Sequence, residues 1–561
     1  MAAAPAATPA PAPDHDMRIA GALALLAFLT VAVVAPVLDA NAAAATFFDD
    51  AFYYFQIARN VAGGAGFTFD GLHVTSGFHP LWLMVQIPLF LLLPGDVLPL
   101  RAVLFLEAAL VAATTVMVFR ALLPRLGRGP ALVSALLLLV QPGAPRILRG
   151  GMEAALVLWL LAVVWTQWLA LRNDAQAPLR RWFWLGAWCA LFFLARLEGA
   201  VAVPILAALA WPRLRHDARR ALALLVPLAL SAAVYLAWTR WTFGTWGPVS
   251  ASVKAHLGGA AWTKLSTGQQ LTQLFYFPWG FEPHVQRLLR WVGVTSLAPP
   301  LAGTLVMVAL LAAVAWQRHR LLPRLREGGA AFVVATAVAM LIIDKVSVRL
   351  MVDWYRAPSL LALALLGGVV VAAHARLARA AVVALAIVGL ARVPQPLWYL
   401  GSSAASPPEG LLAAEWLRPR LQAGAVAGSW NSGLIGYFAG GRVVNLDGVA
   451  NDAAFLREVV SGRDLDGYLE RERVLFLVEG TNAEGRLAPL VRRYPRAVAE
   501  AVEGRYAQVA AFPGTCAPEI ERCPPLTIWE RKGSAEPIGQ PPHPPPAWGG
   551  WGGGSKKGPP R

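Results

Sequence analysis

Apolar runs recur along the chain as far as residue 397, and short clusters of arginine separate many of them. Most of these runs are long enough to cross a hydrocarbon core of about 30 Å as helices, and they lack the period-two alternation that a membrane barrel requires. Placing every basic cluster in the cytoplasm follows the positive-inside rule and predicts eleven crossings. The predicted spans are 19–38, 101–120, 130–145, 152–171, 182–195, 199–211, 221–240, 291–316, 328–343, 357–374 and 380–397.

Two segments interrupt this pattern. The stretch HPLWLMVQIPLFLLLPGD, residues 79–96, is short and rich in proline, and a full crossing there would move the later basic loops to the other side. We therefore expect a re-entrant or interfacial segment, with a full crossing as the alternative. The stretch ARLEGA, residues 195–200, breaks two short apolar runs. Such a break is tolerated inside a membrane only where it lines a polar cavity.

The predicted fold is an α-helical polytopic membrane protein with about 11 to 13 membrane helices and a small C-terminal α/β extracytoplasmic domain. The strand-like stretches AVAGSW, GRVVNLDG and RVLFLVEG indicate that domain. An odd number of crossings places it opposite a cytoplasmic N-terminus. The predicted parts are a disordered leader 1–17, a membrane domain 18–400 with a first extracytoplasmic loop 39–79, the α/β domain 405–533 and a disordered Pro/Gly-rich tail 534–561.

Composition supports this interpretation. The 561 residues are 57% hydrophobic and 15% charged, which excludes an ordinary soluble enzyme. The net charge of +16 comes from short clusters between apolar runs, as in cytoplasmic loops, so no nucleic-acid partner is expected. Cys516 and Cys523 lie close enough for a small disulfide loop, which would require an oxidising compartment.

Two adjacent acids, Asp49 and Asp50, stand at the start of the first loop, just after an apolar run. A single Asp there is most often a helix cap, and Asp49 is placed to cap the helix that follows. Capping accounts for one acid only. With Tyr53 following at helical spacing, the second carboxylate suits a general base that takes a proton from an acceptor hydroxyl.

The predicted topology gathers further charged residues on the same outer side. Each one alone fits a snorkelling side chain or a local ion pair, but Arg196 and Glu198 fall in mid-run, where ionisable groups usually face a polar interior. Acids together with cations suit a sugar hydroxyl that attacks a carbon bearing a phosphate leaving group. The candidate phosphate-binding residues are Lys254, Arg149, Arg196 and Arg356, and the candidate substrate-binding residues are Tyr53, His79, Glu153, Glu198 and Ser250. No metal is required, and no metalloprotease, P-loop or hydrolase motif occurs in its working pattern.

The first loop, DDAFYYFQIARNVAGGAGFTFDG followed by TSGFHPLW, resembles the first extracytoplasmic loop of GT-C glycosyltransferases. The likeness is to the bacterial branch similar to dolichyl-phosphate-mannose transferases and arabinosyltransferases, and GGMEAAL, LARLEGA and GLIGYFAGGRVVNLDGVAN resemble later blocks. It implies an inverting transfer on the outer face with Asp49 as the base and Asp50 beside it, the choice between them remaining open. Lys254 follows a loop that often reads Pro-Asn-Thr in relatives and here reads PVS, so that Ser250 replaces its polar side chains only in part.

The leading hypothesis is therefore a glycosyltransferase of the bacterial inner membrane that needs no cofactor. Its expected partners are a polyprenyl-phosphate-linked sugar donor, membrane lipid and a glycan, lipid or protein acceptor. A transporter or flippase of lipid-linked sugars is the main alternative, but it predicts an inverted repeat that the sequence does not show. A non-catalytic scaffold with a glycan-binding C-terminal domain ranks last because it leaves the paired acids without a role.

Overall fold

The computed structural model describes residues 13–141, 143–263, 266–268, 270, 312, 315–347, 352–397, 407–482, 484–514 and 525–533. Within these residues, seven helical segments are long and apolar enough to cross a membrane, and the chain is a multi-pass membrane protein. The seven segments are Asp14–Val37, Leu98–Leu126, Ala154–Leu171, Ala218–Phe243, Ala330–Ser347, Asp353–Ala373 and Ala378–Leu397. Each of them coincides with one of the eleven predicted spans.

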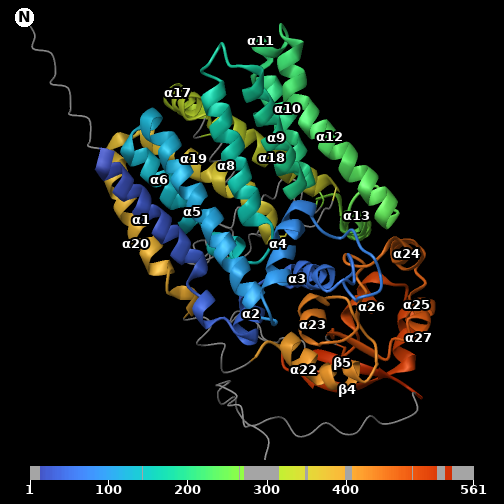
Figure 1. Ribbon diagram of the computed structural model, residues 1–561. Coiled ribbons are helices and arrows are strands. Elements are labelled where there is room, and N and C mark those ends of the chain that lie inside the picture. The colour runs from blue at the N-terminus through green and yellow to red at the C-terminus, as the bar shows by residue number, and fades with distance from the viewer. Residues whose placement is uncertain are drawn as a thin grey trace, which may run out of the picture.

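The helices that build the membrane part run side by side as one bundle (Figure 1). They are α1 (Pro13–Ala32), α5 (Leu98–Leu126), α6 (Arg128–Val140), α8 (Ala154–Leu171), α9 (Leu179–Ala195), α10 (Ala202–Leu209), α12 (Ala218–Phe243), α18 (Ala330–Ser347), α19 (Ala357–Ala373) and α20 (Ala378–Arg392). Shorter helices α7 (Ala144–Leu148), α11 (Trp211–Leu214) and α17 (Arg318–Gly328) connect them. α1 begins at Pro13, so the end of the predicted leader 1–17 is helical.

Three predicted spans correspond to helices shorter than the roughly 20 residues that cross a bilayer. Helix α6 has 13 residues, α9 has 17 and α10 has 8. Helix α4 (Pro80–Leu92), in the segment predicted to be re-entrant, also has 13 residues, which gives a length of about 20 Å, less than the hydrocarbon thickness. The predicted span 291–316 lies mostly outside the described residues, as do Cys516, Cys523 and the tail 534–561.

The predicted break at ARLEGA is present. Helix α9 ends at Ala195, Arg196 has an extended backbone (φ −153°, ψ 126°), and a 3-10 helix η2 (Leu197–Val201) leads into α10. Helix α9 packs closely on α12, because Gly186 brings the two backbones together. A Cβ atom at this glycine would lie 2.4 Å from the carbonyl oxygen of Leu224.

At one end of the bundle, α2 (Ala40–Thr46) and α3 (Asp49–Ala62) lie between the membrane helices and a five-stranded sheet (Figure 1). The strand order is β2-β1-β3-β5-β4, where β1 pairs in parallel with β2 and β3, and β5 is antiparallel to β3 and β4. The strands are β1 (Ala427–Ser429), β2 (Val443–Asn445), β3 (Phe476–Gly480), β4 (Tyr506–Phe512) and β5 (Leu526–Arg531). The helices around the sheet are α22 (Glu409–Gln422), α23 (Gly433–Phe438), α24 (Ala453–Phe455), α25 (Leu465–Arg471), α26 (Ala488–Arg493) and α27 (Arg496–Arg505).

The close contact of α9 and α12 yields a prediction about stability. Gly186→Ala should lower the apparent melting temperature in detergent, because the added methyl group meets backbone rather than a movable side chain, at a cost of about 1–3 kcal/mol. Gly21→Ala in α1 is the matched control, since a Cβ atom added there would have nothing within 4 Å. Equal melting temperatures for the two variants would contradict the packing described here.

Candidate active site

A polar cavity of about 70 Å³ lies where the bundle meets the first loop and the C-terminal sheet. Its lining comes from the start of α3, the end of the first loop, the turn before α8, the break at η2, the start of α13 (Val249–Trp262), the 3-10 helix η3 (Asp353–Arg356) and the turn after β2. Seven of the residues predicted from the sequence line this cavity. They are Asp50, Tyr53, His79, Glu153, Glu198, Ser250 and Lys254.

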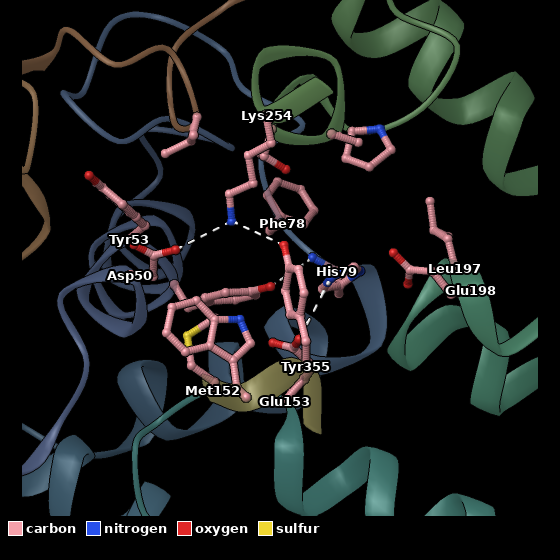
Figure 2. A pocket seen from close by; sticks show the side chains of 17 residues that line it. Asp50, Tyr53, Phe78, His79, Met152, Glu153, Leu197, Glu198, Lys254 and Tyr355 are labelled. Atoms are coloured by element: carbon pink, nitrogen blue, oxygen red, sulfur yellow. Dashed lines mark hydrogen bonds and ion pairs between the residues drawn. The ribbon is translucent and has the colours of Figure 1, made fainter. Parts of the chain in front are cut away.

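Lys254 reaches from α13 to a position between Asp50 and Tyr355 (Figure 2). Its Nζ lies 3.5 Å from Oδ2 of Asp50 and 3.5 Å from the hydroxyl of Tyr355. Burial opposes the ammonium charge, but Tyr355 and Asp50 outweigh it and raise the pKa of Lys254 above its ordinary value. The cavity therefore holds a permanent cation directly beside a carboxylate.

The first loop holds α13, and thus Lys254, in place. The hydroxyl of Ser76 accepts a hydrogen bond of 3.0 Å from the backbone N–H of Val249, the first residue of α13. The same hydroxyl donates to the carbonyl of Gly247 at 3.2 Å and lies 3.1 Å from the hydroxyl of Thr245. One loop segment therefore supplies Asp50 and also fixes the helix that carries its cationic partner.

Asp49 faces away from this cavity. Its carboxylate accepts hydrogen bonds from the backbone N–H groups of Gly433 (3.1 Å) and Leu434 (2.9 Å), at the start of α23. It caps that distant helix rather than its own, since no side chain caps α3. Burial raises the pKa of Asp49 to about 7, with the neighbouring charge of Asp50 adding to the effect and the two N–H groups opposing it.

Tyr53, one turn further along α3, makes a second link to the sheet. Its hydroxyl accepts hydrogen bonds of 3.2 Å from the backbone N–H of Ser432 and from the side-chain amide of Asn445. Asn445 ends β2, and Ser432 lies between β1 and α23. The ring of Tyr53 lines the cavity while its hydroxyl is committed to the sheet.

Arg196 is buried behind the cavity and holds three carboxylates. Its guanidinium lies 3.2 Å from Glu153, 3.3 Å from Glu198 and 3.1 Å from Asp344, and it packs over the ring of Tyr355 at 4.1 Å. Only 2% of its side chain is exposed. Glu153 and Glu198 line the cavity, so this arginine orients two cavity acids without lining it.

His79 lies beside Glu153 on the same wall, with 3.7 Å between its Nε2 and Oε1 of the glutamate. Its backbone N–H donates a hydrogen bond of 3.0 Å to the hydroxyl of Tyr54. This bond fixes the turn that leads into α4, so the imidazole has a defined place in the cavity wall.

Two further predicted phosphate-binding residues, like Arg196, lie outside the cavity lining. Arg149 follows α7 and is largely buried, where burial and the nearby Arg146 lower its pKa to about 10. Arg356 forms an ion pair of 3.0 Å with Asp353 in η3. The structure therefore does not bring either guanidinium together with Asp50 and Lys254.

The sequence analysis did not select Tyr355, Trp354 or Asp344. The aromatic pair lies between the charged residues of VDWYR, a segment that the sequence analysis used only for Arg356, and an acid such as Asp344 near the end of an apolar run is itself a signal of a polar interior. Among the described residues, no group of three or more His, Cys, Asp or Glu side chains is placed to hold a metal ion.

Comparison with solved structures relates this architecture to known proteins. ArnT from Cupriavidus metallidurans, bound to undecaprenyl phosphate, matches with a TM-score of 0.50 and 13% identity over 94% of this chain and 100% of that chain. The Archaeoglobus fulgidus oligosaccharyltransferase matches at a TM-score of 0.49 and 14% identity, over 89% of this chain and 72% of the other. No protein-family model and no curated protein sequence matches the chain. The similarity to ArnT shows that this protein has the fold of the GT-C glycosyltransferases, as the first loop predicted.

The burial of Asp49 predicts a pH dependence of stability. Because its pKa is about 7 in the folded protein and near 3.8 in the unfolded chain, the folded state binds the extra proton between these values, and stability should fall as pH rises from about 4 to 7. Asp49→Asn keeps an oxygen acceptor for α23 and removes this titration. The apparent melting temperature should thus decline less steeply with pH in Asp49→Asn than in wild type, and parallel curves would contradict the assignment.

Proposed function

We propose that this protein is an inverting glycosyltransferase that moves a sugar from a polyprenyl-phosphate carrier to a hydroxyl group of an extracytoplasmic glycan, lipid or protein. The observation that carries the proposal is the pairing of Asp50 with Lys254 across a polar cavity at one end of the membrane bundle. The undecaprenyl phosphate bound by ArnT, which has the same fold, supports a lipid-phosphate donor. The proposed site faces the outer side of a bacterial inner membrane, with the N-terminus in the cytoplasm.

Asp50 is the proposed general base. The acceptor hydroxyl oxygen attacks the anomeric carbon, its proton passes to the Asp50 carboxylate, and the bond between that carbon and the phosphate oxygen breaks. Asp50 suits this role better than Asp49, whose carboxylate is occupied by two backbone N–H groups. Direct displacement inverts the configuration at the anomeric carbon because no covalent sugar intermediate is formed.

Lys254 is the proposed partner of the donor phosphate. The donor phosphodiester carries one negative charge, and the departing polyprenyl phosphate gains a second, which a buried ammonium group stabilises. When a phosphate binds Lys254, Asp50 loses its present ion-pair partner and becomes available to the acceptor. The proposal assigns no role to Arg149 or Arg356, which lie outside the cavity lining.

The remaining lining residues are proposed to hold the sugar. Glu153, Glu198 and His79 offer acceptors and donors for hydroxyl groups, and Ser250 adds a hydroxyl from α13. Arg196 acts as a positioning residue because it holds both glutamates. A volume of about 70 Å³ is well below the roughly 300–1,000 Å³ of typical ligand sites, so the cavity must widen to admit a sugar.

Transfer by the purified protein in nanodiscs, with a panel of radiolabelled polyprenyl-phosphate sugars, tests the base. Asp50→Asn should reduce release of polyprenyl phosphate by about 10²–10⁴-fold, the usual contribution of a general base. Asp49→Asn is the matched control, expected to stay within a few-fold of wild type. Loss of turnover in Asp49→Asn with normal turnover in Asp50→Asn would reverse the assignment, and movement of the lipid across vesicles without release from any donor would favour the flippase.

The role of Lys254 is tested separately. Lys254→Gln removes the cation beside the leaving group and should lower kcat/KM for the donor by about 10²–10³-fold, comparable to loss of one electrostatic stabilising group. His256→Gln, on the exposed side of the same helix, is the control and should leave kcat/KM unchanged. An unchanged donor kcat/KM in Lys254→Gln would show that the phosphate binds elsewhere.

A further inference from the structure

A second and larger cavity, of about 360 Å³, lies in the C-terminal sheet region. Its volume falls within the range of typical ligand sites, in contrast to the cavity around Lys254. Strand ends, the turns that follow them and one helix line it. The lining residues are Trp430, Asn431, Asp447, Glu479, Gly480, Thr481, Ala488, Pro489, Arg492 and Arg493.

The sheet topology explains why a binding cavity forms there. The parallel strands β1, β2 and β3 direct their carboxyl ends to the same edge. From β1 the chain continues to β2 on one side, and from β3 it continues toward β4 and β5 on the other side, so the connections diverge between adjacent strands β1 and β3. In open α/β sheets, ligands bind in the crevice between two adjacent strands whose connections diverge in this way. The cavity lies at such a crevice, because residues that follow β1 and β3 line it.

The polar groups in the cavity are arranged for a ligand that both donates and accepts hydrogen bonds. Glu479 is held in place by backbone N–H groups of Asn431 (3.2 Å) and Gly480 (3.0 Å). Trp430 is only 2% exposed and forms part of the cavity lining. Arg492 and Arg493 are exposed and form no ion pair within the described part of the chain. With two carboxylates and two guanidiniums, the lining has no net charge.

This cavity adjoins the candidate active site through one short turn. Asp447 lines the second cavity, whereas Val449, whose backbone N–H donates to Asp447 at 2.9 Å, lines the cavity around Lys254. Burial raises the pKa of Asp447 to about 6; Arg493 opposes this rise and the charge of Asp50 adds to it. The turn from Asp447 to Val449 therefore contributes to the linings of both cavities.

We propose that this C-terminal cavity is an acceptor subsite that binds a neutral saccharide, which makes the acceptor of this enzyme a glycan. The inference rests on the proposed function, because it assigns the class of molecule that brings a hydroxyl to Asp50. Carboxylates accept hydrogen bonds from sugar hydroxyls, while guanidinium N–H groups donate to them, so the lining matches a polyhydroxylated and uncharged ligand. An anionic glycan is disfavoured because Asp447 and Glu479 offset the two arginines.

The test uses the full-length protein in nanodiscs and a panel of neutral di- to tetrasaccharides made of mannopyranose, arabinofuranose or galactose. Saturation-transfer NMR measures binding, and release of polyprenyl phosphate to water in the absence of acceptor measures donor turnover. At least one saccharide should bind wild type, and Glu479→Gln and the double variant Arg492→Ala/Arg493→Ala should each weaken that binding by about tenfold. Arg496→Ala removes a matched arginine that pairs with Glu500 outside the cavity, and it should bind as wild type does.

The outcomes separate this inference from the proposed function. Retained donor turnover with no saccharide bound by wild type, or with equal binding in wild type and the double arginine variant, overturns the acceptor subsite alone. Sugar transfer to a peptide or lipid, with no saccharide of the panel accepted, also overturns it. If Glu479→Gln fails to fold, the exposed arginine pair decides the question. Saccharide binding without any donor turnover would instead contradict the glycosyltransferase and support a glycan-binding protein.

Discussion

The burial of the Asp49 carboxylate constrains much of this architecture. A carboxylate removed from water is costly unless hydrogen bonds compensate it, and here two backbone N–H groups at the start of α23 offset part of that cost. This pairing fixes the start of α3 against the C-terminal sheet, with Tyr53 as a second attachment. The next residue, Asp50, is then directed toward the membrane bundle. The two adjacent acids thus have separate roles: Asp49 holds the start of α3 against the sheet, and Asp50 lines the cavity.

A second constraint comes from Arg196, whose charge is buried between membrane helices. Buried charges persist where partners compensate them, and three carboxylates from α18, η2 and the turn before α8 surround this guanidinium. Tyr355 joins this cluster to Lys254, since its ring packs against Arg196 and its hydroxyl lies 3.5 Å from Nζ of Lys254. The cavity is therefore an electrostatic unit in which α9, α13, α18 and the first loop depend on one another.

The sequence was sufficient for those features that follow from local pattern. Hydropathy located the seven long membrane segments, and an Arg and a Glu in mid-run marked the break in α9 correctly. Strands β1, β2 and β3 lie within the three stretches that appeared strand-like. Seven of the residues predicted from charge and local motif line one cavity.

Other features depend on contacts between distant segments, which the sequence pattern does not reveal. The role of Asp49 is set by N–H groups 384 and 385 residues away, so no local motif distinguishes it from Asp50. Arg149 and Arg356 were predicted to lie on the same side of the membrane as Lys254. A shared side does not require that their side chains line the same cavity. Asp344 reaches Arg196 only because α18 packs beside η2.

The distance along the chain between Asp49 and its partners also has a consequence for biosynthesis. At a synthesis rate of about 5–20 residues per second, the first loop waits tens of seconds before Gly433 exists. The sheet that presents Gly433 includes β5, which ends at Arg531 and pairs with β3, the neighbour of β1. Until β5 is made, the sheet is incomplete. The first loop then lacks its contacts with the sheet, and the cavity is not fully enclosed. A nascent or truncated chain therefore resides in the membrane with Asp49 and Asp50 exposed and the cavity around Lys254 incomplete, and only the nearly complete protein can form that cavity.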